Sequence, residues 1–522
     1  MASAGTASPP VPKSPAHEGR NRFAFSTAIF LRLLAVIHLI AFISFWTQLS
    51  GLIGAHGILP ADSYLQRVHA QIGAAAYVRL PTLCWQFGAD RFLGVLCATG
   101  VVFSLLLFID IAPAICLVAL WACYLSLVNV GQIFLGFQWD ALLLEATFLA
   151  IFIAPWSWRR RWRFVEPPRL GHTLLLWLLF RLMFLSGVVK LSSGDPNWRN
   201  LSALTFHYET QPLPNAVAWW MNQLPVAVQR ASCAGMFTIE LLVPFFLFGP
   251  RGLRHNAAFL LAALQAAVAL TGNYAFFNFL TIALCLLMFD DAWWRTWPFC
   301  RRVVARSDSE TCRETDAIAG STSAPAIMSA RARPFLPSAV RGAIAALVIG
   351  YTSILALPSF DRTARWPTWF ESVARVIAPF NSLNNYGLFA VMTTSRPELI
   401  FEGSDDGHDW LAYEFPYKPG DLARRPKVVA PHQPRLDWQL WFAALGSADE
   451  NPWVLSLCEQ LLRGTPDVLA LVAHNPFPEH PPHYIRVVRY DYHFTTFAER
   501  ARTGNWWRRT PLDFYVESVA LK

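Results

Sequence analysis

The chain has 522 residues, of which 54% are hydrophobic, 14% aromatic and only 15% charged. Soluble domains usually carry about 25% charged residues, so this composition argues against an ordinary soluble protein. It also excludes disorder for most of the chain, because disordered segments combine low hydrophobicity with high net charge.

The net charge of +8 comes from 43 Lys and Arg against 35 Asp and Glu. With so few charges in total, basic loops beside membrane spans explain this excess better than a nucleic-acid-binding patch, so we expect no nucleic-acid partner. The nine cysteines include no CxxC pair and lie mostly in apolar runs. This pattern argues against a disulfide scaffold and against a thioredoxin-like redox site.

Residues 1–22 are rich in Ser, Pro, Ala and Gly, and predict a disordered tail. Residues 23–357 then contain repeated apolar runs, and a membrane span needs roughly 20 such residues. The runs predict an α-helical polytopic membrane bundle with about nine spans, near 24–47, 92–110, 113–132, 138–155, 172–191, 232–249, 255–271, 274–290 and 338–357.

The arginine clusters predict how this bundle is oriented. They precede the first span, follow the fourth, separate the sixth from the seventh, and lie between the eighth and ninth. With nine spans all four clusters fall on one side, which the positive-inside rule makes cytoplasmic. We therefore expect 291–337 to be a cytoplasmic linker, and 48–91 and 192–231 to be outer loops. A miscount of one span would move everything after about 358 to the other side.

Residues 358–522 predict a soluble, extracytoplasmic domain of mixed α/β type. The expected strands lie at 386–393, 397–402, 409–415 and 484–494, and the expected helices near 436–445, 452–463 and 466–473. The turn Gly403–Gly407 joins two of these strands in a hairpin.

Ionisable side chains inside the apolar runs need a partner or a wet cavity, because charge at membrane depth is costly. In the expected topology Asp140 and Lys190 lie at the outer ends of their spans, and Glu145 and Arg181 lie deeper. Matching by depth predicts two ion pairs, Asp140–Lys190 and Glu145–Arg181. They are either ties that hold the bundle together or part of a cavity in which a desolvated Lys or His acts as a base.

The loop 194–214 follows Lys190 and is dense in polar and aromatic residues. Loops on rigid scaffolds often carry function, which predicts a recognition or active-site rim. The alternative interpretation is that the same residues form a hydrogen-bonded cap over the bundle. The candidate functional residues are Asp195, Trp198, Arg199, His207, Tyr208, Glu209 and Gln211. The helical pattern at 214–230 further predicts a helix lying in the membrane interface, or one packed on the bundle.

Several motifs are absent from the sequence, namely GxSxG, the Walker A and Rossmann glycine patterns, and HExxH. The histidines at 474, 480 and 483 lie in a proline-rich stretch that indicates a loop. We therefore expect neither a metal site nor a cofactor.

Long motifs of this sequence resemble the lipase maturation factor family, and they extend over nearly the whole chain after the tail. They are Gly51–Pro60, Phe137–Glu145, Arg181–Lys190, Gly194–Pro212, Asn381–Phe389, Phe401–Ser404, Tyr413–Phe415, Asn475–Pro478 and Tyr484–Arg486. The resemblance implies a multi-pass membrane protein with a lumenal C-terminal domain. In animals such proteins act in the secretory pathway, in the endoplasmic reticulum membrane, as chaperone-like factors for secreted lipases.

The composition, rich in Ala, Arg and Trp, is typical of a bacterial protein, for which the cytoplasmic membrane would replace the endoplasmic reticulum. The clients could then be exported proteins other than lipases. The membrane part is also distantly similar to that of vitamin K-dependent carboxylases. This second resemblance implies an enzyme acting on a lipid-soluble substrate, with Lys190 and His207 as candidate catalytic residues by position.

We predict a membrane-bound maturation factor, with the enzyme as the alternative. The maturation factor needs an exposed apolar patch on its outer face. The enzyme needs a closed polar cavity that contains Lys190 or His207.

Overall fold

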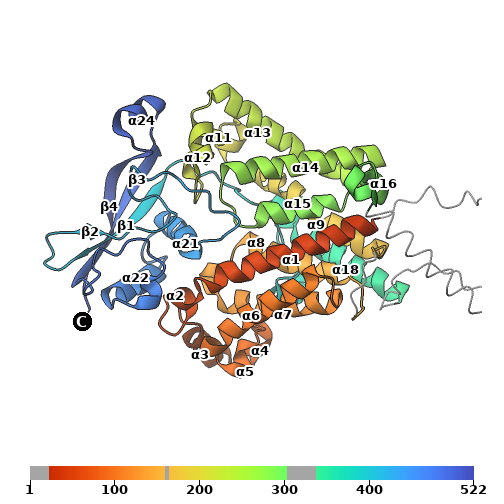
Figure 1. The fold of residues 1–522 in the computed structure, drawn as a ribbon, viewed down its shortest axis with the longest axis horizontal. Coiled ribbons are helices and arrows are strands. Elements are labelled where there is room, and N and C mark those ends of the chain that lie inside the picture. Colours follow the sequence, from red (N-terminus) through yellow and green to blue (C-terminus); the bar gives the residue numbers. More distant parts are fainter. Residues whose placement is uncertain (1–22, 159–163, 303–336, 522) are drawn as a thin grey trace, which may run out of the picture.

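Long apolar helices lie side by side and make up the larger part of the molecule, and the C-terminal part covers one end of them (Figure 1). The structure is a computed structural model that describes residues 23–158, 164–302 and 337–521. The expected tail at 1–22 and most of the expected linker at 291–337 lie outside these residues.

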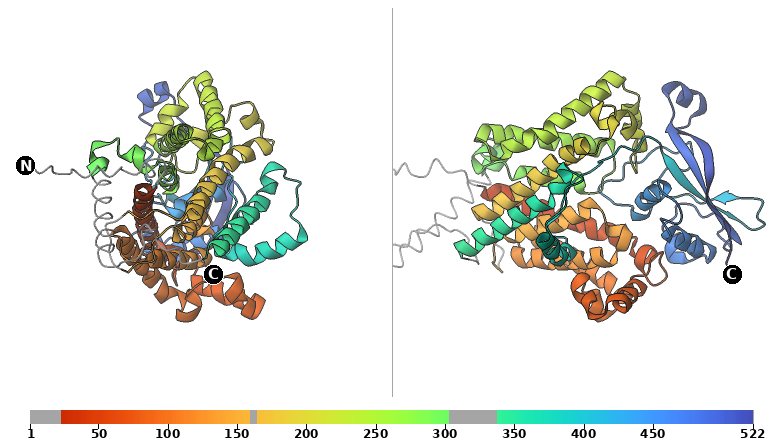
Figure 2. Two further views of the ribbon diagram at one scale, coloured as in Figure 1. Left: turned by 90° about the vertical axis from the view of Figure 1, so that its right-hand side faces the viewer. Right: turned by 180° about the vertical axis from the view of Figure 1, so that it is seen from behind.

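Each of the nine apolar runs contains a helix. These helices are α1 (Ala24–Trp46), α6 (Ala89–Phe108), α7 (Pro113–Val130), α8 (Gln138–Ile151), α9 (Arg169–Ser192), α13 (Val226–Leu241, continued by the 3₁₀ turn η4, Val243–Phe248), α14 (Arg251–Thr271), α15 (Phe277–Leu286) and α18 (Ser338–Leu355). Proline marks several starts: α7 begins at Pro113, where the missing N–H is not needed. Helix α18 packs on the outside of the bundle beside α9 (Figure 2).

Six of the described helices are long and apolar enough to cross a membrane. They are Ala24–Trp46, Pro113–Val130, Arg169–Ser192, Val226–Phe248, Arg251–Thr271 and Ala339–Phe360. The expected count of about nine is not confirmed, because α6, α8 and α15 offer shorter apolar stretches. The 14 residues of α8 rise about 21 Å, whereas the hydrocarbon core is about 30 Å thick.

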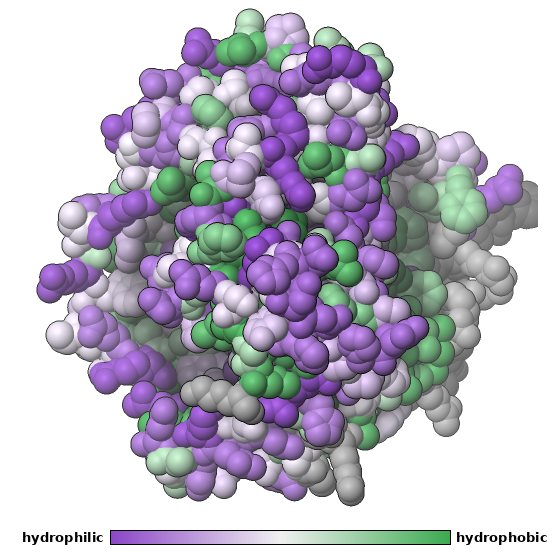
Figure 3. All heavy atoms as spheres, turned by 90° about the vertical axis from the view of Figure 1, so that its left-hand side faces the viewer, coloured by the Kyte–Doolittle hydropathy of each residue, from purple (hydrophilic) through white to green (hydrophobic). Residues whose placement is uncertain are grey.

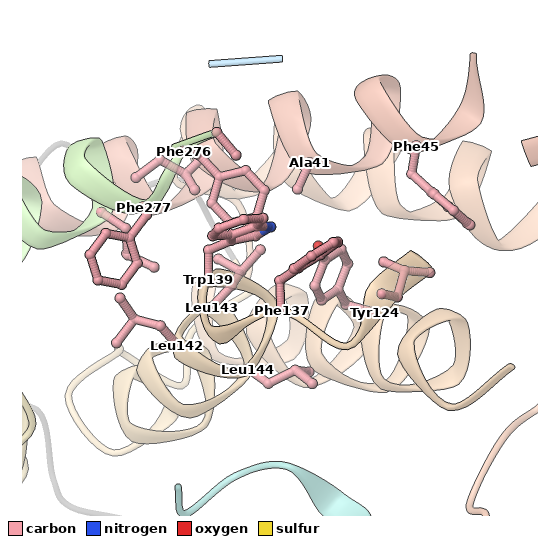
Figure 4. Close-up of a cluster of buried hydrophobic side chains, with 14 of the residues drawn as sticks. Ala41, Phe45, Tyr124, Phe137, Trp139, Leu142, Leu143, Leu144, Phe276 and Phe277 are labelled. Carbon is pink, nitrogen blue, oxygen red and sulfur yellow. The ribbon is translucent and has the colours of Figure 1, made fainter. Parts of the chain in front are cut away.

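The core of the bundle is packed with aromatic and leucine side chains. Phe137, Trp139 and Leu143 lie between α8 and α1 and face Ala41 (Figure 4). The rings of Phe137 and Trp139 are stacked with their centroids 4.6 Å apart. Helices α1 and α6 approach closely at Gly100, where a Cβ would meet ring atoms of Phe42 at 2.4 Å. A larger residue at position 100 would therefore push these two helices apart.

Short helices fill the two long connections at the end of the bundle that bears the C-terminal part (Figure 1). They are α2 (Leu49–Ile53), α3 (Ala61–Ile72), η2 (Gly73–Ala75), α4 (Ala76–Arg79), α5 (Cys84–Phe87), α10 (Pro196–Arg199), α11 (Leu204–Thr210) and α12 (Ala216–Asn222). The 3₁₀ turn η3 (Gln132–Leu135) precedes α8, and α16 (Asp291–Trp294) lies at the opposite end.

The C-terminal part is a four-stranded antiparallel sheet, in the order β2-β1-β3-β4, with helices around it. The strands are β1 (Pro397–Ser404), β2 (Leu411–Ala412), β3 (Tyr484–Phe494) and β4 (Trp507–Val519). The helices around the sheet are α21 (Arg435–Ala444), α22 (Trp453–Leu462), α23 (Pro466–Leu469) and α24 (Phe497–Thr503), whereas α19 (Leu357–Phe360), α20 (Thr368–Ile377) and η5 (Ala378–Phe380) pack on the bundle.

Most of the elements predicted for this part are confirmed. The strand at 484–494 has the predicted bounds, the hairpin around Gly403–Gly407 forms, and helices occupy the three predicted stretches, although α23 is only one turn long. The strand predicted at 386–393 is wrong, because backbone groups of this segment form hydrogen bonds with side chains of the loop 194–214 instead of with another strand. The carbonyl of Phe389 accepts from Trp198, and the N–H of Met392 donates to Asp195. Helices α20 and α24 and strand β4 were not predicted.

Helix α21 attaches the C-terminal part to the bundle through a buried ion pair. The Arg435 guanidinium donates to both carboxylate oxygens of Asp140 on α8, at 2.6 and 2.8 Å. Tyr124 of α7 donates to the same carboxylate at 2.5 Å, and Arg435 also donates to the carbonyl of Phe134. Asp140, Tyr124 and Arg435 are almost completely buried, so the C-terminal part completes the bundle core.

This arrangement corrects one of the predicted ion pairs. Asp140 does not pair with Lys190, because the guanidinium of Arg435 occupies its carboxylate and Lys190 has another partner, Glu240. The prediction searched only the apolar helices, whereas the partner of Asp140 lies 295 residues further along the chain.

We expect Arg435→Met to destabilise the protein strongly, because it leaves the buried Asp140 carboxylate without its cation. Removing one partner of a buried pair costs about 3–5 kcal/mol. Thermal unfolding of the detergent-purified protein measures this loss, and adding Asp140→Asn should recover part of it. The matched control is Arg463→Met, because Arg463 forms an exposed pair with Glu459 and such pairs contribute about 0–1 kcal/mol. Additive losses in the double variant would contradict the coupling.

Candidate functional site

The second predicted pair is present: Arg181 of α9 donates to the Glu145 carboxylate of α8, and both side chains are buried. The segment that leads into the sheet completes this pair. Arg181 donates to the carbonyl of Asn384 at 2.7 Å, and the free carboxylate oxygen of Glu145 accepts from the N–H of Asn384 at 2.9 Å and from the Tyr386 hydroxyl at 2.7 Å. The sequence analysis missed both partners, although they lie inside the motif Asn381–Phe389.

Lys190 is held by Glu240 of α13, whose two carboxylate oxygens lie 2.9 and 2.8 Å from its nitrogen. The ammonium group also faces the ring of Trp198, 5.5 Å from its centroid. Both charged side chains are nearly buried. Lys190 therefore ties α9 to α13, and its nitrogen is already engaged by a carboxylate.

The first part of the loop 194–214 binds the segment before β1. Asp195 caps α10 by accepting from the N–H of Asn197 at 2.8 Å, and it accepts from the N–H of Met392 at 2.6 Å. Trp198 donates through its indole nitrogen to the carbonyl of Phe389 at 2.9 Å. Arg199, in contrast, is exposed on the surface.

His207 and Gln211 meet at the hydroxyl of Tyr274, which follows α14. This hydroxyl donates to Gln211 at 2.9 Å and lies 3.2 Å from Nε2 of His207. Burial lowers the pKa of His207 to about 4, and the nearby charge of Lys190 lowers it further. A general base that works near pH 7 needs a pKa closer to that pH, so His207 is poorly tuned for this role.

Arg396, the residue before β1, binds the end of the loop through hydrogen bonds. Its guanidinium donates to the carbonyls of Glu209 at 2.7 Å and Pro212 at 2.9 Å, and also to the carbonyl of Gln211. Glu398 balances its charge at 2.7 Å. Arg396 is fully buried, so three carbonyl groups within four residues of the loop are bound to one side chain of the C-terminal part.

Tyr208 and Glu209 complete this junction. Tyr208 is buried in a cluster with Trp219, Ile400 and Trp507. The Glu209 carboxylate accepts from the N–H of Phe494 at 2.7 Å, and its other oxygen lies 2.8 Å from Nδ1 of His493. The structure thus brings all the candidate loop residues except Arg199 into a junction between the bundle and the sheet. These contacts are the ones that a hydrogen-bonded cap requires.

His493 on β3 lies between two carboxylates, Glu209 on one ring nitrogen and Asp491 on the other at 3.0 Å. The hydrogen bond to Glu209 raises the pKa of His493 above its ordinary value, and the charges of Glu209 and Asp491 raise it further. A protonated His493 therefore ties the sheet to the loop.

An aromatic patch lies at the end of the sheet away from α24, beyond the contacts with the bundle, and we define it as Trp410, Arg486 and Phe514. The Arg486 guanidinium lies 4.2 Å from the centroid of Trp410 and 5.6 Å from that of Phe514, and it pairs with Glu402 at 2.7 Å. Phe514 is 58% exposed. The end of the C-terminal part facing away from the bundle is mostly hydrophilic, with apolar side chains between the polar ones (Figure 3).

Among the described residues there is no group of three or more His, Cys, Asp or Glu that could hold a metal ion. Of the three histidines noted in the sequence, His483 bonds the carbonyl of Asp405 and His480 lies near the Asp405 carboxylate.

Protonation of His493 should make stability depend on pH. Because its pKa is raised on folding, its contribution is fully present below the unfolded pKa of about 6.5 and is lost as the pH rises through the folded pKa. We expect the difference in unfolding free energy between the native chain and His493→Gln to shrink as the pH is raised from about 6.5 into the alkaline range. Chemical unfolding across this range measures it, with the exposed His408→Gln as control. A difference that stays constant with pH would contradict the assignment.

Comparison with known proteins agrees with this architecture. Residues 25–296 match the family described as lipase maturation factor transmembrane domain, and residues 382–517 match the lipase maturation factor C-terminal domain. Lipase maturation factor 2 of Homo sapiens is 35% identical over 611 residues, covering 94% of this chain and 82% of that protein. The Gallus gallus protein of the same name is 36% identical, covering 94% of this chain and 81% of its own length.

Lipase maturation factor 1 of Homo sapiens is 33% identical over 540 residues, covering 99% of this chain and 92% of that protein. No solved structure matches the chain. The two matched regions correspond to the helical bundle and to the part that contains the sheet. On this agreement along nearly its whole length, the chain belongs to the lipase maturation factor family.

Proposed function

We propose that this protein is a membrane-anchored maturation factor that binds partly folded exported proteins at its C-terminal part, on the side of the membrane away from the cytoplasm. The observation that carries the proposal is the match along nearly the whole chain to proteins named lipase maturation factors. Secreted lipases are the first clients to test, and other exported proteins are the next.

The geometry supports a rigid platform. Three contacts fasten the C-terminal part to the bundle: Arg435 on Asp140, Asn384 on the Glu145–Arg181 pair, and Arg396 under the loop. The charged side chains in all three are buried, so a client bound to the sheet would stay at a fixed position relative to the membrane. Such a surface suits a factor that holds one part of a client while the rest folds.

The distribution of charge supports the proposed orientation. Arg251, Arg254 and Arg301 belong to the end of the bundle opposite the C-terminal part, near α16 (Figure 1), and basic residues favour the cytoplasmic side. We therefore propose 23–357 as the membrane domain and 358–522 as its extracytoplasmic domain. The endoplasmic reticulum membrane is the proposed location in an animal cell, and the cytoplasmic membrane in a bacterium.

The aromatic patch is the proposed client surface. Aromatic residues and Arg dominate the binding energy of protein interfaces, and here Arg486 holds Trp410 and Phe514 together on an accessible face. A factor that prefers unfolded chains would destabilise the native client if it stayed bound. The patch must therefore bind weakly enough to release the client as it folds.

The proposed orientation can be tested with a reporter that is active only outside the cytoplasm. A fusion after Lys522 should be active, because the C-terminal part and the outer loops share one end of the bundle. A fusion after Arg301, at the other end, is the matched negative control. An inactive reporter at Lys522 together with an active one at Arg301 would reverse the orientation.

Phe514→Ser and Trp410→Ala should lower the activity of a co-expressed secreted lipase about fivefold or more, because truncating an interface hot spot costs at least 1–2 kcal/mol. The abundance and thermal stability of the factor should stay close to those of the native chain, since Phe514 is 58% exposed and Trp410 is only partly buried, outside the contacts between the sheet and the bundle. The assay compares secreted lipase activity with secreted lipase mass.

The matched control is Leu455→Ser. Leu455 is also exposed, but it lies on α22. The inner side of α22 packs with Ile485 and Val487, which lie on the opposite face of the sheet from Arg486. Normal lipase activity with both patch variants would rule out the patch as the client surface.

A further inference from the structure

A small hollow lies between α12 and α24, which stand next to each other at one end of α13 (Figure 1). It is a shallow, open hollow of about 210 Å³ lined by Trp219, Phe497, Arg500, Ala501 and Gly504. Helix α24 starts with a capping box and ends at Gly504, whose φ of +75° is a conformation that glycine adopts readily. The hollow is therefore built from two well-defined helix ends rather than from a loose loop.

Two hydrogen-bond donors at this hollow have no partner in the described part of the chain. They are the indole nitrogen of Trp219, a side chain that is fully buried, and Nε of Arg500. The Arg500 guanidinium stacks on Trp506 at 3.7 Å and lies 5.1 Å from the ring of Trp219. A buried donor without an acceptor costs free energy, so an acceptor bound in the hollow would stabilise both groups.

The charge at the hollow is positive and unbalanced. The nearest acid on α24, Glu499, is engaged elsewhere: it accepts from the N–H of Thr496 at 2.7 Å and lies 4.0 Å from Arg508. Arg425 adds a second guanidinium, 5.6 Å from the ring of Trp506. Within the described residues no carboxylate forms an ion pair with Arg500, so the missing acceptor should be an anion.

The position of the hollow indicates which anion. Helix α12 is fastened to the start of α13, because Gln229 donates to the carbonyls of Met221 and Asn222 at 3.2 and 3.3 Å. Helix α13 begins the candidate span Val226–Phe248. Next to the hollow, Trp220 and Phe497 are 53% and 51% exposed, with ring centroids 5.3 Å apart. Exposed aromatic rings at the end of a span are typical of the headgroup region of a bilayer.

We propose that this hollow binds the phosphate-bearing headgroup of an anionic membrane lipid. Arg500 pairs with the phosphate oxygens, the Trp219 indole N–H donates to one of them, and Trp220 and Phe497 face the acyl chains. Pockets that enclose a whole small molecule measure about 300–1,000 Å³. The smaller volume here fits a headgroup whose chains remain in the bilayer, and the bound lipid fixes α24 to the membrane surface.

The test uses the full chain purified in a zwitterionic detergent and titrated with short-chain phosphatidylglycerol or phosphatidylcholine. Thermal stability and native mass spectrometry measure binding. Saturable binding and stabilisation by phosphatidylglycerol, with little effect of phosphatidylcholine, is the expected result. Equal effects of both lipids would overturn the proposal, as would equally tight binding of glycerol 3-phosphate, which would indicate a free anion. Tighter binding of an acidic peptide would make the hollow a protein-binding site instead.

Two variants connect the binding to the hollow. Arg500→Gln should weaken phosphatidylglycerol binding about tenfold or more, and Trp219→Phe about tenfold, since each removes a hydrogen bond to a charged group. The control for Arg500 is Arg502→Gln on the same helix. Trp366→Phe is the control for Trp219, because Trp366 also has a buried, unpartnered indole nitrogen but packs against Phe370.

Trp219→Phe is the decisive variant if Arg500→Gln fails to fold. The Trp219 nitrogen bonds nothing in the described residues, so its removal breaks no internal hydrogen bond. Native-like lipid affinity in Trp219→Phe would overturn the proposal.

Discussion

The two carboxylates of α8 are the constraint on which the rest of the structure depends. Asp140 and Glu145 are both completely buried in the bundle, and an uncompensated charge in such a place would be very costly. Each finds an arginine, Arg435 for Asp140 and Arg181 for Glu145. One of these arginines and several of the hydrogen bonds around both carboxylates come from beyond residue 380. The bundle therefore has a complete core only when the C-terminal part is docked on it.

This dependence explains which contacts the sequence could predict. Glu145 and Arg181 lie on consecutive helices that pack together, so matching them by depth was enough. Arg435 lies in a stretch that looks like part of a soluble domain, and no local pattern links it to a helix 295 residues earlier. Among the strands, β3 was predictable from its β-branched and aromatic residues. Strand β4 was not, because Arg508 to Asp513 include Pro and several charges and become a strand only by pairing with β3.

The difference in span count has a related cause. Hydropathy identifies an apolar helix, but such a helix can be surrounded either by lipid or by other parts of the protein. Ten of the 14 residues of α8 are buried in the described structure, so its apolar side chains pack against other parts of the protein. A helix buried in this way can be too short to cross a membrane. In contrast, only a third of the candidate spans Val226–Phe248 and Arg251–Thr271 is buried, as expected for helices that face lipid. Sequence alone does not separate these two kinds of apolar helix.

The junction also connects the proposed surfaces to one another. Strands β3 and β4 form a hairpin whose connection is α24, so the hollow at Arg500 lies at one end of the hairpin, and the aromatic patch at Arg486 and Phe514 lies towards the other. His493, which holds β3 to the loop through Glu209, lies between them. Because the strands are rigid and fastened at that point, lipid bound at α24 would set the height and tilt of the patch above the membrane. The client surface would then be positioned by the bilayer itself as well as by the bundle.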